Sequence, residues 1–452
     1  MQAICRFNTT NSKKKSVQWY NESILPLLWG KTFSSPQTVL NQFDQIITTA
    51  DGKLIDNTRT IEEDICKTLL AKGVTPSTLI WDPTNFFTYI EKGGALPQKG
   101  ASKEKRFDKN IVSLGLVVSK ENIPLMHTVY EGDVHESKTF SALVDALYTR
   151  LSRVSKDAND FVIIFDKGNN SEENIPFVNN RFHFIGGLKK NQLKHLFNVG
   201  LENFEELYTS RNGNIVNGYR TKEMVYGKPY TIVVCFNQKS FDKQKLKTEE
   251  SVKKISRRFE KLALKLSAKK KGKPTTIKGV SVQVYDFLYK QYRALFTWRF
   301  NEQTQVLTWS VNQDAFRERE KTYGKNLVFT DLDGWATADI AKTYNSKAIV
   351  ESDFRVLKDR LVISAKPFFG RLDNRLRMHL FTCVLSLVLY RYMLFKLKDL
   401  KLTEPVIREE IRNMRLAFVK EDGSNSVKKV LENMTPIQVR IYNCLGLEKY
   451  VP

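Results

Sequence analysis

The stretch Thr78-Leu-Ile-Trp81-Asp82-Pro83 decides the fold of this chain, together with its counterpart Phe161-Val-Ile-Ile-Phe165-Asp166-Lys167-Gly168. Each is a short apolar run that ends in an aspartate and is followed by turn residues. Such runs predict buried strands in the centre of a sheet. An aspartate at the carboxyl end of such a strand lies where open α/β folds place their sites. A strand-terminal aspartate is also common as a turn former or helix N-cap, so neither run alone decides the function.

The segments between the two aspartates predict further elements of the same sheet. Residues 110–118 and 123–130 are expected to be strands joined by a hairpin loop at 120–122. Residues 137–154 show helical periodicity, and residues 182–186 are expected to be a fifth strand. Three strands, a helix and a fourth strand, with carboxylates on the first and the fourth, indicate an α/β core of the ribonuclease-H-like type.

A third carboxylate lies in the segment from Tyr344 to Lys358, which contains no Gly or Pro and is predicted to form a single helix. At about 100° per residue, Tyr344, Lys347, Glu351 and Lys358 fall within a sector of roughly 60°, with Arg355 beside it. A carboxylate flanked by cations suits a metal ion that holds a phosphodiester. A solvated, salt-bridged helix face is the alternative for this stripe.

These three segments, in this order, resemble the DDE transposases of insertion sequences. The group concerned ends in a Tyr-x2-Arg-x3-Glu-x6-Lys motif, which here is Tyr344-x2-Lys347-x3-Glu351-x6-Lys358, with Lys in place of the usual Arg. The resemblance also covers Trp-Asp-Pro-Thr-Asn-Phe-Phe at 81–87, Phe-Asp-Lys-Gly-Asn-Asn at 165–170 and Gly-Ala-Ser-Lys-Glu-Lys-Arg at 100–106. It extends from about residue 75 to residue 395.

The resemblance implies that Asp82, Asp166 and Glu351 are the catalytic residues and bind two Mg²⁺ ions, with Mn²⁺ able to substitute. It also implies that Tyr344, Lys347 and Lys358 hold phosphates near a transposon end, and Arg355 is expected to join them. Lys at position 347 keeps the charge of the usual Arg but loses its bidentate fork. Relatives carry a base-stacking Trp just before the last strand of the core. Here Gly324-Lys325-Asn326 stand at that position, and Tyr323 is the nearest aromatic residue.

The function that the resemblance implies is cut-and-paste transposition, with metal-dependent cleavage at transposon ends and strand transfer into target DNA. The expected partners are double-stranded DNA, as terminal inverted repeats and as target, and a second copy of the chain in a synaptic homodimer. Two alternatives stay open. One is a ribonuclease-H-like nuclease without strand transfer, and the other is a domesticated, non-enzymatic DNA-binding protein.

The expected organisation has five parts. A helical N-terminal segment (1–75) that could bind DNA or only pack on the core precedes the first part of the catalytic core (76–190). A mainly β insertion (191–325) follows, because Glu351 lies 185 positions after Asp166. The second part of the core (326–398) carries the Glu351 helix, and the chain ends in a helical segment (399–452).

A strongly basic segment at 245–278 interrupts the expected insertion. It holds thirteen Lys or Arg against three Glu, and its apolar residues mark a helix with one apolar stripe. Lys269, Lys270 and Lys271 then begin a loop. We expect these three lysines to contact DNA phosphates, since so dense a field of one sign is costly without a partner. A solvated basic helix docked by its apolar face is the alternative.

The composition agrees with a polyanionic partner. The 452-residue chain has a net charge of +23 and a pI near 9.6, but charge alone does not tell DNA from RNA or from an anionic membrane. Its five cysteines form no CxxC pair, which argues against a zinc site and against a disulfide framework. The apolar run at 380–390 is too short for a membrane span. With no signal peptide evident, we expect a cytoplasmic, nucleoid-associated prokaryotic protein without a membrane partner.

Overall fold

The computed structural model describes residues 1–9, 12–51, 53–75, 77–155, 158–210, 212–268, 274–368, 370–420 and 427–450. The chain divides into two compact units. The first consists of Met1–Phe184 and Ser346–Pro452, and the second of Ile185–Asn345. The second unit therefore takes in more of the chain than the insertion expected at 191–325.

The first unit contains a mixed sheet with strand order β5-β4-β3-β6. Its elements are β3 (Thr78–Thr88), β4 (Asn110–Ser119), β5 (Pro124–Glu131), α6 (Glu136–Val154) and β6 (Val162–Phe165). The strands β3, β4 and β5 pair antiparallel, whereas β3 and β6 are parallel. This succession confirms the three strands, helix and fourth strand predicted from the sequence.

The strand β3 is longer than its apolar run predicts. It continues through Asp82 and Pro83 to Thr88, so the expectation that Asp82 ends the strand is wrong. The carbonyl of Pro83 accepts a hydrogen bond from the side chain of Lys103 and thus points away from the paired strand β4. Because the N–H and C=O of one strand residue point to the same side, the missing N–H of Pro83 costs the β3–β4 ladder nothing.

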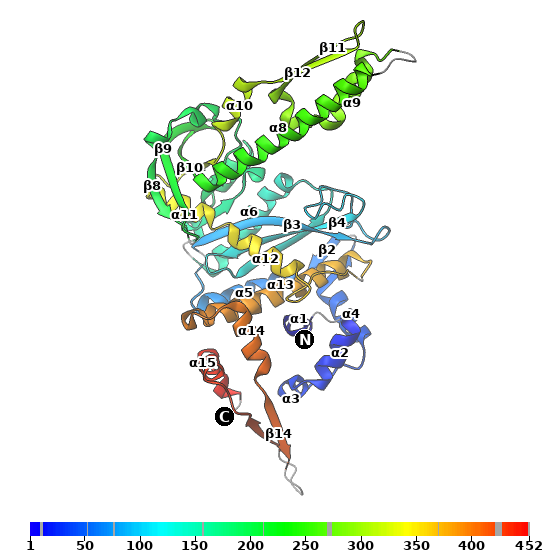
Figure 1. Cartoon of the computed structure of the whole chain (residues 1–452). Coiled ribbons are helices and arrows are strands. Elements are labelled where there is room, and N and C mark those ends of the chain that lie inside the picture. Colours follow the sequence, from blue (N-terminus) through cyan, green and yellow to red (C-terminus); the bar gives the residue numbers. More distant parts are fainter. Residues whose placement is uncertain are drawn as a thin grey trace. The chain divides into compact units, whose positions relative to one another are not determined.

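The longest described helix of the first unit, α13 (Asp373–Lys396), packs against β5. It also packs against the N-terminal helices (Figure 1). By length and composition α13 could cross a membrane, but 67% of its most apolar window is buried inside the protein. Polar side chains on α13, among them Ser386 and Thr382, are also buried and bond to backbone carbonyls. This packing is typical of a core helix.

The N-terminal segment packs on α13 through a small apolar cluster that includes Val39, Phe43 and Phe381. Its elements are α1 (Gln2–Asn8), α2 (Lys13–Glu22), α3 (Leu25–Trp29), α4 (Pro36–Ile46), β1 (Ile47–Ala50), β2 (Lys53–Asp56) and α5 (Thr58–Ala71). The segment is therefore not purely helical, since β1 and β2 form an antiparallel hairpin. Its contacts with α13 fit the expectation of an extension that packs on the core.

The C-terminal segment also differs from the helical expectation. After α14 (Glu404–Asn413), strands β14 (Leu416–Lys420) and β15 (Val427–Leu431) pair antiparallel, and α15 (Pro436–Leu445) follows. Helix α15 begins with a capping box made by Thr435 and Gln438.

The strands of the second unit follow the order β7-β13-β10-β9-β8. Strand β7 confirms the fifth strand expected at 182–186; it begins at His183 in the first unit and continues into the second. The bounds are β7 (His183–Gly187), β8 (Glu205–Thr209), β9 (Ile215–Val225), β10 (Lys228–Phe236) and β13 (Lys325–Thr330). The unit contains two antiparallel hairpins, β9–β10 and β11 (Phe296–Asn301) with β12 (Val306–Val311). The expectation of a mainly β insertion is nevertheless wrong, because α8 (Gln238–Ser267) alone runs for 30 residues and α9 (Ile277–Phe287) and α10 (Gln313–Glu320) follow it.

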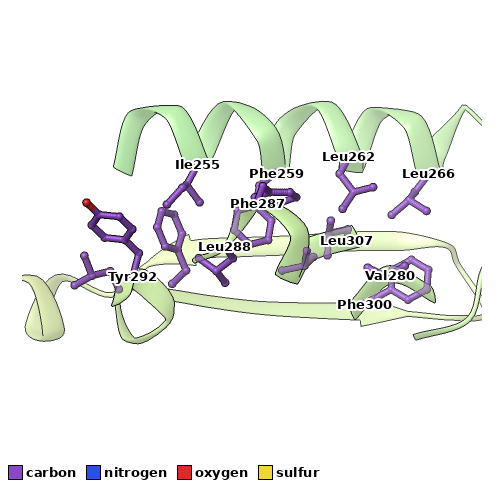
Figure 2. Close-up of a cluster of buried hydrophobic side chains, with 13 residues drawn as sticks. Ile255, Phe259, Leu262, Leu266, Val280, Phe287, Leu288, Tyr292, Phe300 and Leu307 are labelled. Carbon is purple, nitrogen blue, oxygen red and sulfur yellow. The ribbon is translucent and has the colours of Figure 1, made fainter. Parts of the chain in front are cut away.

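The basic helix α8 is fixed by a hydrophobic core of its own. Its buried residues Ile255, Phe259, Leu262 and Leu266 recur every three to four positions and face α9 and the β11–β12 hairpin (Figure 2). Phe259 is fully buried and stacks on Trp309, with ring centroids 5.4 Å apart. The apolar stripe is thus used for packing, and the lysines and arginines between its members are mostly exposed.

Candidate active site

Asp82 and Asp166 lie side by side in the register of two parallel strands. Thr78, Leu79 and Ile80 pair with Val162, Ile163 and Ile164. The same register, continued by two residues, sets Asp82 opposite Asp166, the residue directly after β6. Both side chains are partly exposed. The chain therefore brings two carboxylates to neighbouring positions of the sheet, as the sequence predicts.

The carboxylate of Asp166 is held by neighbours that include a backbone N–H and an ammonium group. Its Oδ1 accepts a hydrogen bond from the Lys167 backbone N–H at 2.8 Å, which caps a short 3₁₀ turn. The Lys347 ammonium lies 3.1 Å from the same oxygen. Burial raises the pKa of the Asp166 carboxyl, but these positive partners outweigh it and hold that pKa below its ordinary value. Asp166 is therefore an anion near neutral pH, the state that a metal ligand requires.

The segment from Tyr344 to Lys358 is not the single helix predicted from the sequence. Helix α11 (Thr337–Asn345) ends before Ser346, and α12 (Ala348–Lys358) begins after Lys347, its N-cap residue. Asn345 and Ser346 are poor helix formers whose side chains compete for backbone hydrogen bonds, and this accounts for the break. Tyr344 belongs to α11 and is buried, so it does not share a helical stripe with Glu351.

Helix α12 packs against β3 (Figure 1), and its two ends contact Asp166 and the part of β3 just after Asp82. Lys347, at its N-terminal end, pairs with Asp166. Lys358, at its C-terminal end, donates a hydrogen bond of 2.8 Å to Thr84 Oγ1, two residues beyond Asp82 on β3. Glu351 and Arg355 lie between these ends and are exposed. Of the predicted stripe, Glu351 and Lys358 therefore share α12, with Arg355 beside them, and Lys347 is the N-cap residue of that helix.

A buried ion pair that sequence reasoning missed anchors α12 to α13. Asp353 is completely buried, and its Oδ1 accepts a hydrogen bond of 2.6 Å from Arg391 Nε, itself only 7% exposed at the side chain. Arg391 also donates to Ser352 Oγ at 3.0 Å. Burial raises the pKa of the Asp353 carboxyl to about 7, although Arg391 lowers it. Asp353 is two residues after Glu351 on α12, so this ion pair helps to fix the position of the Glu351 carboxylate.

The described residues include no group of three His, Cys, Asp or Glu side chains close enough to hold a metal ion. The structure thus aligns Asp82 with Asp166 and directs α12 toward both, but it does not assemble the three carboxylates into a closed cluster. The donor set itself fits Mg²⁺ or Mn²⁺, since both prefer carboxylate oxygens.

Two other sequence-based expectations concern the second unit. Lys269, Lys270 and Lys271, predicted to contact phosphates, lie outside the described residues. Tyr323, the nearest aromatic to the position of the base-stacking Trp, is buried, and its hydroxyl donates to Thr248 Oγ1 at 2.8 Å. A buried ring fixed in this way cannot stack on a base.

A comparison with protein families matches the part of the chain that contains Asp82, Asp166 and Glu351. The model of a family described as "Transposase DDE domain" matches residues 75–387. No curated protein matches the chain.

Among solved structures, the chain is similar to "Mos1 transposase paired-end complex with left transposon end", with 12% identity and a TM-score of 0.19 over 40% of this chain and 56% of that one. It is also similar to "Crystal structure of the Mos1 mariner paired end complex with Mn", with 14% identity and a TM-score of 0.16 over 43% and 55% of the two chains. The chain thus spans little more than half the length of these structures, and at such TM-scores neither similarity supports an argument.

Proposed function

Because the chain belongs to the family of transposases with a DDE domain, we propose that it cleaves DNA at transposon ends and joins those ends to target DNA. The observation that carries the proposal is the parallel register of β3 and β6, which sets Asp82 opposite Asp166. The helix that carries Glu351 packs against the first of these strands. The proposed catalytic core is of the ribonuclease-H-like type.

In this proposal Asp82, Asp166 and Glu351 hold two Mg²⁺ ions, which Mn²⁺ could replace. Metal ions at such a site activate the attacking hydroxyl group and stabilise the leaving 3′-oxygen. Lys347 now neutralises Asp166, and a divalent ion there would compete with its ammonium. Displaced from Asp166, Lys347 would still stand one turn before Glu351 on α12, where its ammonium can hold a phosphate oxygen.

The proposed DNA contacts are Lys347, Arg355 and Lys358 of the first unit, and the lysines at 269–271 with the exposed cations of α8 in the second. Tyr344 remains a proposed contact only through its hydroxyl, because its ring is buried. The partners in this scheme are double-stranded DNA, as terminal inverted repeats and as target, and a second copy of the chain in a synaptic homodimer. The setting is the nucleoid in a prokaryotic cytoplasm.

A two-plasmid assay with purified full-length protein tests the proposed function. The donor plasmid carries a marker between the DNA sequences that flank the gene, and the second plasmid serves as target. In Mg²⁺ we expect cleavage at the ends of the flanks and recovery of the marker in the target. Cleavage without joining would point to a nuclease. Sequence-specific binding without cleavage would point to a non-enzymatic DNA-binding protein.

A further inference from the structure

The carboxyl-terminal half of β3 has an edge without a paired strand in the described register. The pairing of β3 with β6 covers only Thr78–Ile80, whereas β3 runs to Thr88. Side chains of a nearby loop occupy this edge instead. Lys103 Nζ donates to the Pro83 carbonyl at 2.6 Å, and Glu104 Oε2 accepts from the Phe87 N–H at 3.1 Å. The edge beside Asp82 is therefore lined by charged groups.

The loop that supplies these groups belongs to the Gly100–Arg106 motif and is held by hydrogen bonds to β3. Asn85 Nδ2 donates to the Ala101 carbonyl, and Asn85 Oδ1 accepts from the Lys103 N–H, both at 2.9 Å. Asn85 is buried, so the backbone of Lys103 is fixed at this point of the strand.

Two further lysines reach the same place from the segment that contains and follows α12. Lys366 Nζ lies 2.5 Å from Glu104 Oε1 and 3.8 Å from the centre of the Phe87 ring. Lys358 Nζ donates to Thr84 Oγ1. We call Lys103, Lys358 and Lys366 the β3 basic shelf. Glu104 is the carboxylate that touches it.

The shelf places like charges close together; Lys358 and Lys366 are partly buried, and Lys103 is exposed. The pKa of Lys358 lies below its ordinary value, first because of burial and further because the ammonium groups of Lys366 and Lys103 are near; Glu104 and Asp82 act in the opposite direction. Covering the strand edge requires only Lys103 and Glu104. Glu104 pairs with Lys366 and, with Asp82, offsets part of this charge, but three ammonium groups face two carboxylates here, and the remaining positive charge suits an added anion.

We propose that the β3 basic shelf is a phosphate-binding site, in which Lys103 and Lys366 join Lys358 in holding the DNA backbone next to the phosphodiester at Asp82. The inference rests on the proposed function, because it takes the anion to be DNA. Lys103 and Lys366 bind phosphate directly in this arrangement. Glu104 is a positioning residue, which holds Lys366 through its Oε1 and β3 through its Oε2.

Binding of full-length protein to a 30-base-pair duplex, measured by fluorescence anisotropy in EDTA over a range of salt concentrations, tests the shelf. The variant Lys103→Gln/Lys366→Gln should bind more weakly than the wild type. Its log–log salt slope should be shallower by nearly two units, about 0.9 for each lost contact. The matched control is Lys105→Gln, which removes one exposed cation from the same loop and should leave most of the affinity. Lys103→Arg/Lys366→Arg should keep the wild-type slope.

The outcomes separate the shelf from the proposed function. An unchanged salt slope in the double Gln variant would overturn the shelf, even if the wild type cleaves and joins DNA. So would a loss of affinity in Lys105→Gln as large as the loss per lysine in the double Gln variant. If the double Arg variant loses as much DNA affinity as the double Gln variant, the loss comes from a structural change and not from the missing charge. That result would also overturn the shelf. A wild type that binds the duplex through the shelf but never cleaves a flanking sequence would contradict only the proposed function.

Discussion

Replacing Arg391 by Met should strongly destabilise the first unit, because it leaves the Asp353 carboxylate buried without its cation. Asp353 is completely buried, and Arg391 Nε lies 2.6 Å from its Oδ1. Asp353 can take up a proton when Arg391 is absent, so the loss at pH 6 comes mainly from the hydrogen bonds that Arg391 makes and amounts to about 1–3 kcal/mol of the free energy of unfolding. Met fills a similar volume, so the loss reflects charge and hydrogen bonding more than a cavity.

The loss should depend on pH in a direction that the structure determines. Burial raises the pKa of Asp353 to about 7, above the unfolded value of about 3.9. The folded protein therefore keeps a proton that the unfolded chain releases. The contribution of the Asp353 carboxyl to the free energy of unfolding is fully present below about pH 4 and is lost as the pH rises through 7. Without Arg391 the folded pKa rises further and the loss continues at higher pH. The free energy of unfolding that Arg391→Met loses relative to the wild type should therefore be about 1 kcal/mol larger at pH 8 than at pH 6.

Urea unfolding of the full-length protein at pH 6 and pH 8, followed by circular dichroism, measures both effects. Arg412→Met, at an exposed arginine of α14, is the matched control and should change stability by less than about 0.5 kcal/mol. The double variant Asp353→Asn/Arg391→Met should lose the added dependence on pH. A deficit below about 1 kcal/mol for Arg391→Met, or the same deficit at both pH values, would refute the reasoning.

Three further predictions concern the site and its supports. Lys347→Ala should slow cleavage of a transposon end, and Lys347→Arg should preserve or improve it, since the guanidinium fork can hold both Asp166 and a phosphate; equal rates for alanine and wild type would make Lys347 a surface cation. Gly115→Ala should lower the melting temperature, because a Cβ there would lie 1.8 Å from the Trp81 ring and overpacking costs about 1–3 kcal/mol; an unchanged melting temperature would show that the ring moves freely. Phe259→Ala should lower the free energy of unfolding by about 3–5 kcal/mol and speed amide hydrogen exchange in α8, because the ring is fully buried. Unchanged exchange in α8 would contradict the packing in Figure 2.

The strands and their carboxylates could be predicted from the sequence because buried central strands leave a continuous apolar run. The run before Asp82 marks the start of β3 correctly, and the run before Asp166 marks the start of β6 to within one residue. The end of β3 could not be predicted in this way. A proline such as Pro83 usually indicates that a strand stops. Only the tertiary arrangement shows that its missing N–H faces the edge of β3 for which the described residues provide no paired strand.

Helix ends and buried charges were harder to predict for two different reasons. The break at Ser346 involves neither Gly nor Pro, so periodicity alone runs straight through it. The start of α8 did carry a signal, because Asn237 is an N-cap whose side chain accepts from the Ser240 N–H. The Asp353–Arg391 pair left none: the two residues are 38 positions apart, and a charged residue in a sequence does not show whether it is buried.

The most direct test of the account is Mg²⁺-dependent cleavage of a cognate transposon end by the wild type and by Asp82→Asn, Asp166→Asn and Glu351→Gln, with DNA binding measured beside it. Loss of a metal ligand removes several kcal/mol of transition-state stabilisation. Each variant should therefore cleave at least about a thousandfold more slowly, while binding the same DNA within a few-fold of the wild type. A variant that cleaves at the wild-type rate in Mg²⁺ would remove its residue from the site and contradict the proposed triad.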